Sequence, residues 1–226
     1  TRVQKFSSEG DFILEWKINQ NRWPTGLAVD QGNNVYVVDH QKIQVFNPQG
    51  NLLREFSGTD NTGRFESGIA VAKTGEIIVP DPRSHTVQVF RQNGGISHSF
   101  GEQAFSQPGD IIGAQGVVVG PTGNVYISNS RHDAIAIFTN EGNFIDEWYI
   151  DNSTFGLNGI DVDDSGNLFV FDTNNRFVRK ISQQGRVISQ WGGSATPGDD
   201  EDAPDGLFNA RCWGPSDLAV TNNRVY

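Results

Sequence analysis

The chain has 226 residues, of which 26 are glycine and 19% are charged, and it contains no apolar run of the ~18 residues needed to cross a bilayer. This composition indicates a turn-rich globular protein without a transmembrane segment. Asp and Glu number 27 against 17 Lys and Arg, which gives a formal net charge of −10. Because so acidic a chain repels phosphate backbones, nucleic acid is disfavoured as a partner.

The start of the chain and its single cysteine bear on processing and compartment. The chain begins Thr1-Arg2-Val3 and contains no methionine, so we expect a processed product or a fragment of a longer protein. Cys212 stands alone, which excludes an internal disulfide, and because no catalytic motif surrounds it we predict a buried thiol. These features leave the compartment open, and we favour an extracellular or cell-envelope location.

A repeat runs through the sequence. An aromatic residue or Ile is followed four residues later by Gly and six residues after that by Trp or Phe, five times with the same spacing. The copies are Phe6-Gly10-Trp16, Phe46-Gly50-Phe56, Phe90-Gly94-Phe100, Phe138-Gly142-Trp148 and Ile181-Gly185-Trp191. A fixed period of this length is the signature of a repeat architecture.

A second block precedes each of the last four copies. It reads Gly-apolar-x-Val, then Gly or Asn, then Asp or Asn, and its members are Gly26/Asn33/Asp39, Gly68/Gly75/Asp81, Gly116/Gly123/Asn129 and Gly159/Gly166/Asp172. In the first full unit the two blocks predict strands at 26–30, 35–39, 43–47 and 51–56, joined by tight turns in which Gly or Asn adopts a positive φ. Four antiparallel strands in about 42 residues are the size of one propeller blade.

The residues of this unit resemble a known family. Pro-x-Gly-Leu-Ala-Val-Asp at 24–30, Asn-Val-Tyr-Val-Val-Asp at 34–39, Ile-Gln-Val-Phe at 43–46 and Gly-Asn-Leu-Leu-x-x-Phe at 50–56 look like the NHL repeat, and similar blocks cover nearly the whole chain. The Trp-Asp signature of WD40 repeats is absent. The resemblance implies an all-β fold, a β-propeller of four-stranded antiparallel blades, with six blades usual in the family. We therefore expect residues 1–226 to form a single NHL-type propeller.

The two ends leave the number of blades open between five and six. The chain opens with the second half of a repeat, Val3 to Trp16, and stops in the first half of another, Pro215 to Tyr226. Either these halves form one composite blade that closes a five-bladed ring, or a segment is missing and the ring has six. We favour the missing segment, because the run at Arg-Val-Tyr elsewhere continues to Asp or Asn.

Basic residues recur in one set of loops. In a propeller of this topology the loops between second and third strands share a face with the outer-to-inner connections, and binding residues concentrate on such loops. The loops contribute the candidates Lys42, Arg83, His85, Arg131, His132 and Arg176. This cationic ring is suited to an acidic peptide, an anionic small molecule or RNA. The alternative is a structural role in which these side chains bond to neighbouring blades.

Polar residues also recur just before the inner strands. The position directly before the first Gly of the second block is polar in each repeat: Thr25, Ser67, Gln115 and Asn158. Ser216 takes this position in the last repeat. We expect them to ring the channel mouth, where a small polar ligand would fit, or alternatively to cap the strand starts. Asp217 replaces the Gly of the other repeats and is the strongest single-residue candidate. The strand-end residues Asp39, Asp81, Asn129 and Asp172 are read as structural acceptors of loop N–H groups.

One connection is longer and more acidic than the others. The predicted insertion loop 193–212 carries a dense group of carboxylates, including Asp199, Asp200 and Asp202. Hard oxygen ligands suit Ca²⁺, so these three residues are candidate metal ligands. Because the spacing of an EF-hand is absent, a solvated loop is the alternative, and no cofactor is firmly predicted.

The favoured function is a binding or scaffold module that presents its loop face to a protein, a peptide or another ligand. The alternative is a metal-dependent hydrolase or lyase acting at the central channel, as the resemblance to propellers such as peptidyl-hydroxyglycine amidating lyases and gluconolactonase-like hydrolases implies. His40, His85 and His132 lie in loops and His98 in an outer strand, and no Glu completes a ligand set with Asn158 and Asp217. We therefore lean against an enzyme and assign no catalytic residue.

Overall fold

The computed structural model describes residues 1–18, 24–39, 42–58, 65, 67–101, 107–150, 156–193, 218–221 and 224–225. Several predicted features lie outside these residues: Cys212, Asp217, the candidate calcium ligands Asp199, Asp200 and Asp202, and nearly all of the insertion loop 193–212. Among the described residues no helix occurs, and hence none that is long and apolar enough to span a bilayer.

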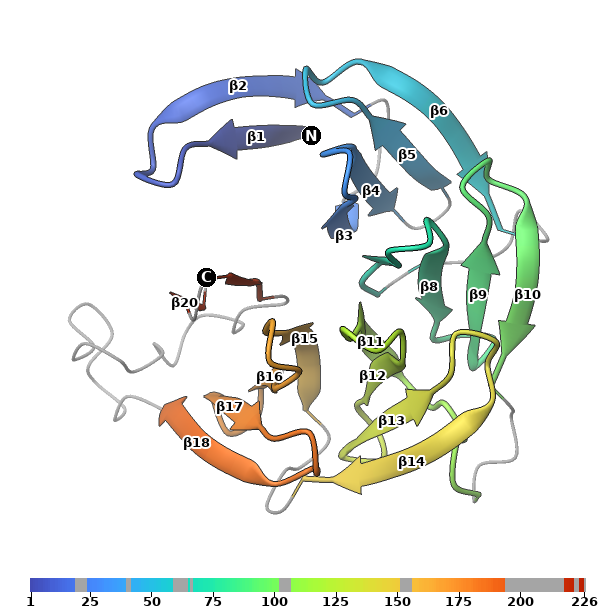
Figure 1. Ribbon diagram of the computed structural model, residues 1–226, viewed down its shortest axis with the longest axis vertical. Coiled ribbons are helices and arrows are strands. Elements are labelled where there is room, and N and C mark those ends of the chain that lie inside the picture. The colour runs from blue at the N-terminus through green and yellow to red at the C-terminus, as the bar shows by residue number, and fades with distance from the viewer. Residues whose placement is uncertain are drawn as a thin grey trace.

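The described chain is an arc of antiparallel sheets around a central axis (Figure 1). Blade one consists of β3 (Pro24–Val29), β4 (Val35–Asp39), β5 (Lys42–Phe46) and β6 (Leu52–Ser57). Blade two consists of β7 (Ala70–Val71), β8 (Ile77–Asp81), β9 (Thr86–Phe90) and β10 (Ile96–Phe100). Blade three consists of β11 (Ala114–Val119), β12 (Val125–Asn129), β13 (Ala134–Phe138) and β14 (Phe144–Tyr149). Blade four consists of β15 (Leu157–Val162), β16 (Leu168–Asp172), β17 (Phe177–Ile181) and β18 (Val187–Gly192).

Two smaller sheets extend the arc at its ends. β1 (Arg2–Phe6) pairs with β2 (Phe12–Lys17), and β19 (Val220–Thr221) pairs with β20 (Arg224–Val225). The first packs on blade one, where Trp16 contacts Phe46. At the other end Leu218 and Val220 pack against Phe169 and Phe171 of blade four.

The predicted number of five to six blades needs correction for the part of the chain that is described. It contains four complete four-stranded blades and two two-stranded sheets. The sheets β1–β2 and β19–β20 do not pair with each other, so within the described residues they do not form the composite blade expected for a five-bladed ring. Apolar packing, rather than strand pairing, attaches each of them to its neighbouring blade.

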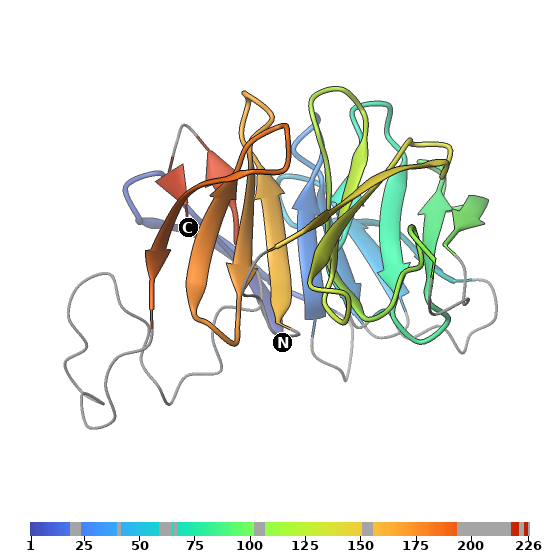
Figure 2. The same cartoon turned by 90° about the horizontal axis from the view of Figure 1, so that it is seen from below.

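The blades follow the predicted order of strands. In each, the strand that comes first in the chain lies nearest the axis and the fourth lies outermost (Figure 1). The strands predicted at 26–30, 35–39, 43–47 and 51–56 agree with β3 to β6 within two residues. The predicted turn residues Asn33, Gly75, Gly123 and Gly166 all adopt positive φ angles, between 59° and 94°. Seen from the side, the turns gather on two opposite faces (Figure 2).

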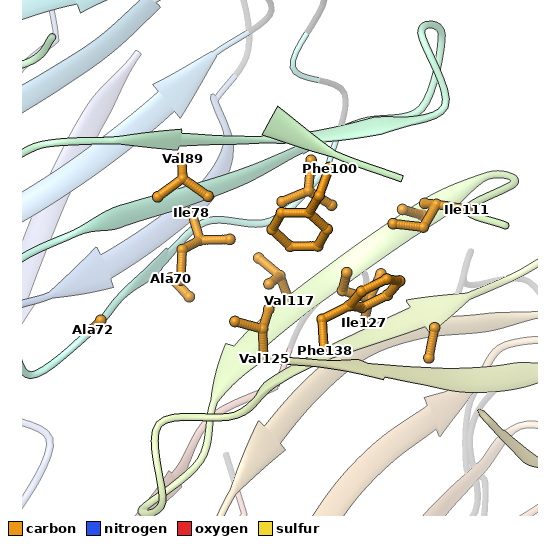
Figure 3. Close-up of a cluster of buried hydrophobic side chains, with 13 residues drawn as sticks. Ala70, Ala72, Ile78, Val89, Phe100, Ile111, Val117, Val125, Ile127 and Phe138 are labelled. Atoms are coloured by element: carbon orange, nitrogen blue, oxygen red, sulfur yellow. The ribbon is translucent and has the colours of Figure 1, made fainter. Parts of the chain in front are cut away.

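The hydrophobic core lies between the blades. Ile78 and Val89 of blade two and Val117, Ile127 and Phe138 of blade three belong to one buried cluster (Figure 3). Equivalent clusters join blade one to blade two and blade three to blade four. Each sheet therefore buries both faces against neighbours, which explains why the second and third strands are apolar on both sides.

The blade interfaces also explain the spacing of the repeat. The aromatic residue that ends one outer strand packs against the aromatic residue that ends the third strand of the next blade, as Phe100 does with Phe138 at 4.9 Å between ring centroids. The same aromatic residue lies over the hairpin glycine of the next blade: a Cβ added to Gly142 would lie 2.5 Å from the Cβ of Phe100. Gly50, Gly94 and Gly185 face Trp16, Phe56 and Trp148 in the same way. The motif therefore encodes contacts between successive blades.

Candidate functional site

The loops between second and third strands are held by the polar residue that ends the second strand. In blade two, Oδ1 of buried Asp81 accepts hydrogen bonds from the N–H groups of Arg83 at 3.0 Å and Ser84 at 3.2 Å. In blades one and four, Asp39 and Asp172 accept the N–H groups of Lys42 and Asn175. The predicted structural role of these three carboxylates is confirmed.

Asn129 has a related but different role in blade three. Its Oδ1 accepts the N–H of Ile112 at 2.9 Å, and its Nδ2 donates to the carbonyl of Asp110 at 2.7 Å. The N–H of Arg131 in turn donates to the carbonyl of Ile112 at 3.3 Å. Asn129 therefore ties the segment before the inner strand β11 to the loop that carries Arg131.

An open cavity lies between blades two and three on this loop face. Its volume is about 640 Å³, and it is lined by Pro82, Arg83, His85, Gly113, Gln115 and Arg131. A neighbouring cavity of about 410 Å³ shares Gly113, Gln115 and Arg131 and adds Ser130. Four predicted site residues, Arg83, His85, Gln115 and Arg131, thus meet at one cavity. Among the described residues no carboxylate lines it.

Backbone contacts hold the residues of the cavity in place. The carbonyl of Gln115 accepts the N–H of Gly68, two residues before the inner strand β7 of blade two, at 2.7 Å. Gly113 has a φ of 69°, and a Cβ added to it would lie 3.2 Å from Cγ of Arg131. The Arg131 stem therefore packs over a glycine. His85 has a φ of 57°, a conformation that few non-glycine residues adopt.

The other predicted cationic residues do not line this cavity. Nζ of Lys42 forms an ion pair with Glu55 on the outer strand β6. Nδ1 of His132 lies 3.4 Å from Oε1 of Glu147 on β14, whose side chain is only 3% exposed. Arg176 belongs to blade four and has a φ of 58°. The structure therefore brings together part of the predicted ring, in one sector.

The side chains of three predicted channel-mouth residues form hydrogen bonds within the chain. Oγ1 of Thr25 donates to the carbonyl of Phe65 at 3.0 Å, and Oγ of buried Ser67 donates to the carbonyl of Pro80 at 2.7 Å. Nδ2 of Asn158 donates to Oγ1 of Thr173 at 3.2 Å. Such hydrogen bonds are what the alternative interpretation, strand capping, expects, and a polar ligand at the channel mouth stays a prediction.

The central channel is lined by the inner strands, whose side chains there are mostly apolar. Its volume is about 810 Å³, and its walls include Leu27 and Val29, Ile69 and Val71, Val117 and Val119, and Leu218 and Val220. Asp161 is the one charged side chain among the described residues that line it. Its Oδ2 accepts the N–H of Val220 at 2.6 Å and its Oδ1 accepts the N–H of Val162 at 2.8 Å. Asp161 thus joins blade four to β19.

Burial raises the pKa of the Asp161 carboxyl, although the hydrogen bonds from Val220 and Val162 act in the opposite direction. A raised pKa means that the folded state binds a proton more tightly than the unfolded state, whose aspartate pKa is about 3.9. The stability that this proton contributes is present below the unfolded pKa and is lost as pH rises through the folded pKa. Asp161→Asn should therefore become more stable relative to the parent as pH rises over this window, which urea unfolding between about pH 3 and pH 7 measures.

Asp163 provides a matched control on the turn that follows the same strand. Burial acts to raise the pKa of Asp163, but hydrogen bonds from Asn167 and the ion pair with Lys180 lower it overall. The stability that ionised Asp163 contributes is present above the unfolded pKa and is lost as pH falls through the lowered folded pKa. Asp163→Asn should therefore become less stable relative to the parent as pH rises. Equal pH dependence of the two variants would contradict both assignments.

The sequence reasoning missed Pro82, Gly113 and Ser130 at the cavities and Asp161 in the channel. Asp161 could have been found from the sequence, because it places a charged residue where the other repeats have the apolar Ala28, Ala70 and Val118. Pro82, Gly113 and Ser130 carry no chemical signal of their own, and only the packing of two blades places them at the cavity. Within the described ranges, no group of three or more His, Cys, Asp or Glu residues is arranged to hold a metal ion.

Comparisons with known proteins support the fold. No family model matches the chain. The chain is 27% identical over 147 residues to the protein brain tumor of Drosophila melanogaster, a match that covers 62% of this chain and 13% of that protein. The chain thus spans only a small part of this relative.

Solved structures show the same architecture at low identity. A streptogramin B lyase superposes with a TM-score of 0.67 at 14% identity, covering 84% of this chain and 61% of that one. The WD40 β-propeller domain of Doa1 superposes with a TM-score of 0.60 at 15% identity, covering 77% of this chain and 55% of that one. The propeller fold is thereby confirmed, and it is shared by proteins of different function.

Proposed function

We propose that the chain is a binding module, an NHL-type propeller that uses its loop face to bind a peptide segment of a partner protein through an acidic group. The observation that carries this proposal is the cavity between blades two and three, where Arg83 and Arg131 meet on a chain whose net charge is −10. Positive groups concentrated at one concave site attract an anionic ligand.

The hydrogen bonds that hold the loops of the cavity favour a role in binding. Asp81 and Asn129 are 4% and 0% exposed. Asp81 holds the loop that carries Arg83 to the end of β8, and Asn129 holds Ile112, whose carbonyl in turn accepts the N–H of Arg131. Loops anchored in this way lose little conformational entropy when a ligand binds. A rigid sheet that presents short polar loops is a common basis for recognition.

The fold does not choose between binding and catalysis, because the similar structures include both a lyase and a WD40 domain. The choice rests on the site. The described residues supply a cationic cavity, which favours binding, and a metal-dependent hydrolase or lyase acting at the channel is the alternative. Calcium binding by Asp199, Asp200 and Asp202 stays a prediction.

Selection of peptides from a random displayed library on the purified 226-residue chain tests this function. We expect acidic peptides to be enriched, and their affinity to fall at least about tenfold in an Arg83→Ala/Arg131→Ala variant, since hydrogen bonds to charged groups contribute roughly 1.5–3 kcal/mol each.

The matched control is Arg91→Ala. Arg91 is exposed and lies in the turn between β9 and β10, on the opposite face of the same blade. This variant removes a positive charge of the chain without touching the cavity, so peptide binding should be retained. Failure to enrich any peptide, or equal losses in both variants, would refute the proposed use of the loop face.

A further inference from the structure

The central channel extends toward the face opposite the loop face. Because the strands of each blade are antiparallel, the turns between first and second strands lie on this opposite face, here called the turn face (Figure 2). The channel lining includes Val29, Val71 and Val119, the last residues of three inner strands, after which these turns begin. The lining does not include the predicted channel-mouth residues of the loop face, Thr25, Ser67, Gln115 and Asn158.

The channel wall offers apolar side chains to a ligand. Leu27 and Val29 are 47% and 53% exposed, and both line the channel. The channel volume of about 810 Å³ lies within the range of ~300–1,000 Å³ that is usual for small-molecule sites. A ligand that removes these side chains from water gains from the hydrophobic effect. The walls therefore suit a molecule with an apolar body.

A carboxylate stands on this wall. Asp161 is the one charged side chain among the described residues that line the channel, and its two oxygens accept the N–H groups of Val162 and Val220. An ionised carboxylate has about four acceptor sites, so about two remain for a ligand. Among the described residues, the ion pairs of the chain do not include Asp161.

The two backbone contacts do not account for the charge of Asp161. Burial is the main cause that raises the pKa of its carboxyl, and the hydrogen bonds from Val220 and Val162 offset it only in part. A neutral amide or hydroxyl oxygen could accept an N–H group without the cost of burying a charge. A cation beside the carboxylate would stabilise its charged form. A cationic ligand therefore explains why this position carries a carboxylate.

The turn face carries the same sign of charge as Asp161. Its described turns between first and second strands contain one lysine, Lys73, and four carboxylates, Asp30, Glu76, Asp163 and Asp164. Asp163 is paired with Lys180 of β17. Carboxylates gathered near an entrance attract cations and repel anions. The charges at the entrance and inside the channel thus favour the same class of ligand.

We propose that the central channel binds a small organic cation, an apolar molecule with one ammonium group, which places the ammonium beside Asp161 and its apolar body against the inner strands. A lysine side chain of a partner protein presents the same ammonium group. It is the weaker fit, because the peptide backbone that carries it brings polar groups that apolar side chains leave unsatisfied. This site is separate from the cavity of the loop face.

Isothermal titration of the 226-residue chain with ligands of equal chain length tests the proposal. The ligands are hexylammonium, hexanol and hexanoate, and a capped peptide with one central lysine presents the ammonium on a protein backbone. We expect hexylammonium to bind at least about tenfold more tightly than each of the other three, because only it combines a positive charge with an apolar body.

A pair of tryptophan variants locates the binding site. Val29→Trp fills part of the channel from a side chain that is already half-exposed, and it should weaken hexylammonium binding at least about tenfold. Its matched control is Leu53→Trp on the outer strand β6, where Leu53 is 51% exposed, and this variant should bind as the parent does. Circular dichroism checks that both variants are folded.

A pair of asparagine variants tests the charge. Asp161→Asn should weaken hexylammonium binding at least about tenfold and leave hexanol binding unchanged. Asp11→Asn, which removes an exposed carboxylate from the turn between β1 and β2, should leave both unchanged. If Asp161→Asn loses the contact with β19 and does not fold, the comparison of the three hexyl ligands on the parent chain still tests the charge.

Four outcomes would overturn this inference. Equal affinity for hexylammonium and hexanol would remove the role of the Asp161 charge, and the absence of hexylammonium binding would remove the site. Unchanged binding in Val29→Trp would show that the cation binds elsewhere on this acidic chain. Tightest binding of the lysine peptide would replace the small molecule with a protein side chain. The proposed function is tested separately, by the loss of acidic peptides in Arg83→Ala/Arg131→Ala.

Discussion

Asp172→Ala is expected to lower the free energy of unfolding by about 4 kcal/mol, within the ~3–5 kcal/mol that follows the loss of one partner of a buried ion pair. Asp172 is 0% exposed, and its Oδ2 accepts hydrogen bonds from Arg179 at 2.9 Å and from Nδ2 of Asn175 at 2.9 Å. The substitution leaves the Arg179 guanidinium buried without this carboxylate. Chemical unfolding in urea measures the change.

The repeat itself provides the control for this prediction. The position of Arg179 is occupied by Gln44 in blade one and Gln88 in blade two. The double variant Asp172→Ala/Arg179→Gln removes the buried charge together with its partner, and we expect it to recover at least half of the loss. If the single variant costs less than about 1 kcal/mol, or if the double variant recovers nothing, the ion pair does not stabilise blade four.

Gly142→Ala is expected to lower the free energy of unfolding by about 3 kcal/mol. Gly142 has a φ of 86°, where an L-residue is strained by about 1–2 kcal/mol. The added Cβ would also lie 2.5 Å from Cβ and 2.6 Å from Cγ of Phe100, so blades two and three must separate locally at a cost of about 1–3 kcal/mol. Thermal and urea unfolding both measure the loss.

Gly10→Ala is the matched control for the contact between blades. Gly10 occupies the same position of the repeat with a φ of 90°, but an added Cβ would meet nothing within 4 Å. The control therefore includes the backbone strain without the clash, and we expect it to cost about 1 kcal/mol. Similar losses in the two variants would show that the packing of Phe100 on Gly142 contributes little.

The strand pattern could be predicted from sequence because each strand is defined by local features. Alternation of apolar residues and the positive φ of residues such as Asn33 and Gly75 depend on a few neighbouring positions. The spacing from Phe46 to Gly50 to Phe56 was also visible. Its meaning was not, because Gly50 contacts Trp16 of the preceding sheet and Phe56 contacts Phe90 of the following blade.

The structure brings only part of the predicted group of site residues to one cavity. Basic residues of second-to-third strand loops were identified by position, but position does not show which carboxylate lies nearby. Glu55 and Glu147 come from outer strands and engage Lys42 and His132. Register between third and fourth strands places these partners, and register could not be derived from the spacing of the basic residues alone.

By itself the sequence determined that the chain is an all-β repeat protein, that each repeat has four strands, and where the turns and the loop cations lie. These properties depend on local periodicity and on backbone preferences of single residues. The tertiary structure decided which cations share a cavity, that Asp161 ties blade four to β19, and that the described chain contains four complete blades. Those properties depend on how one blade packs against the next, and residues such as Arg83 and Arg131, 48 positions apart in the chain, meet only through that packing.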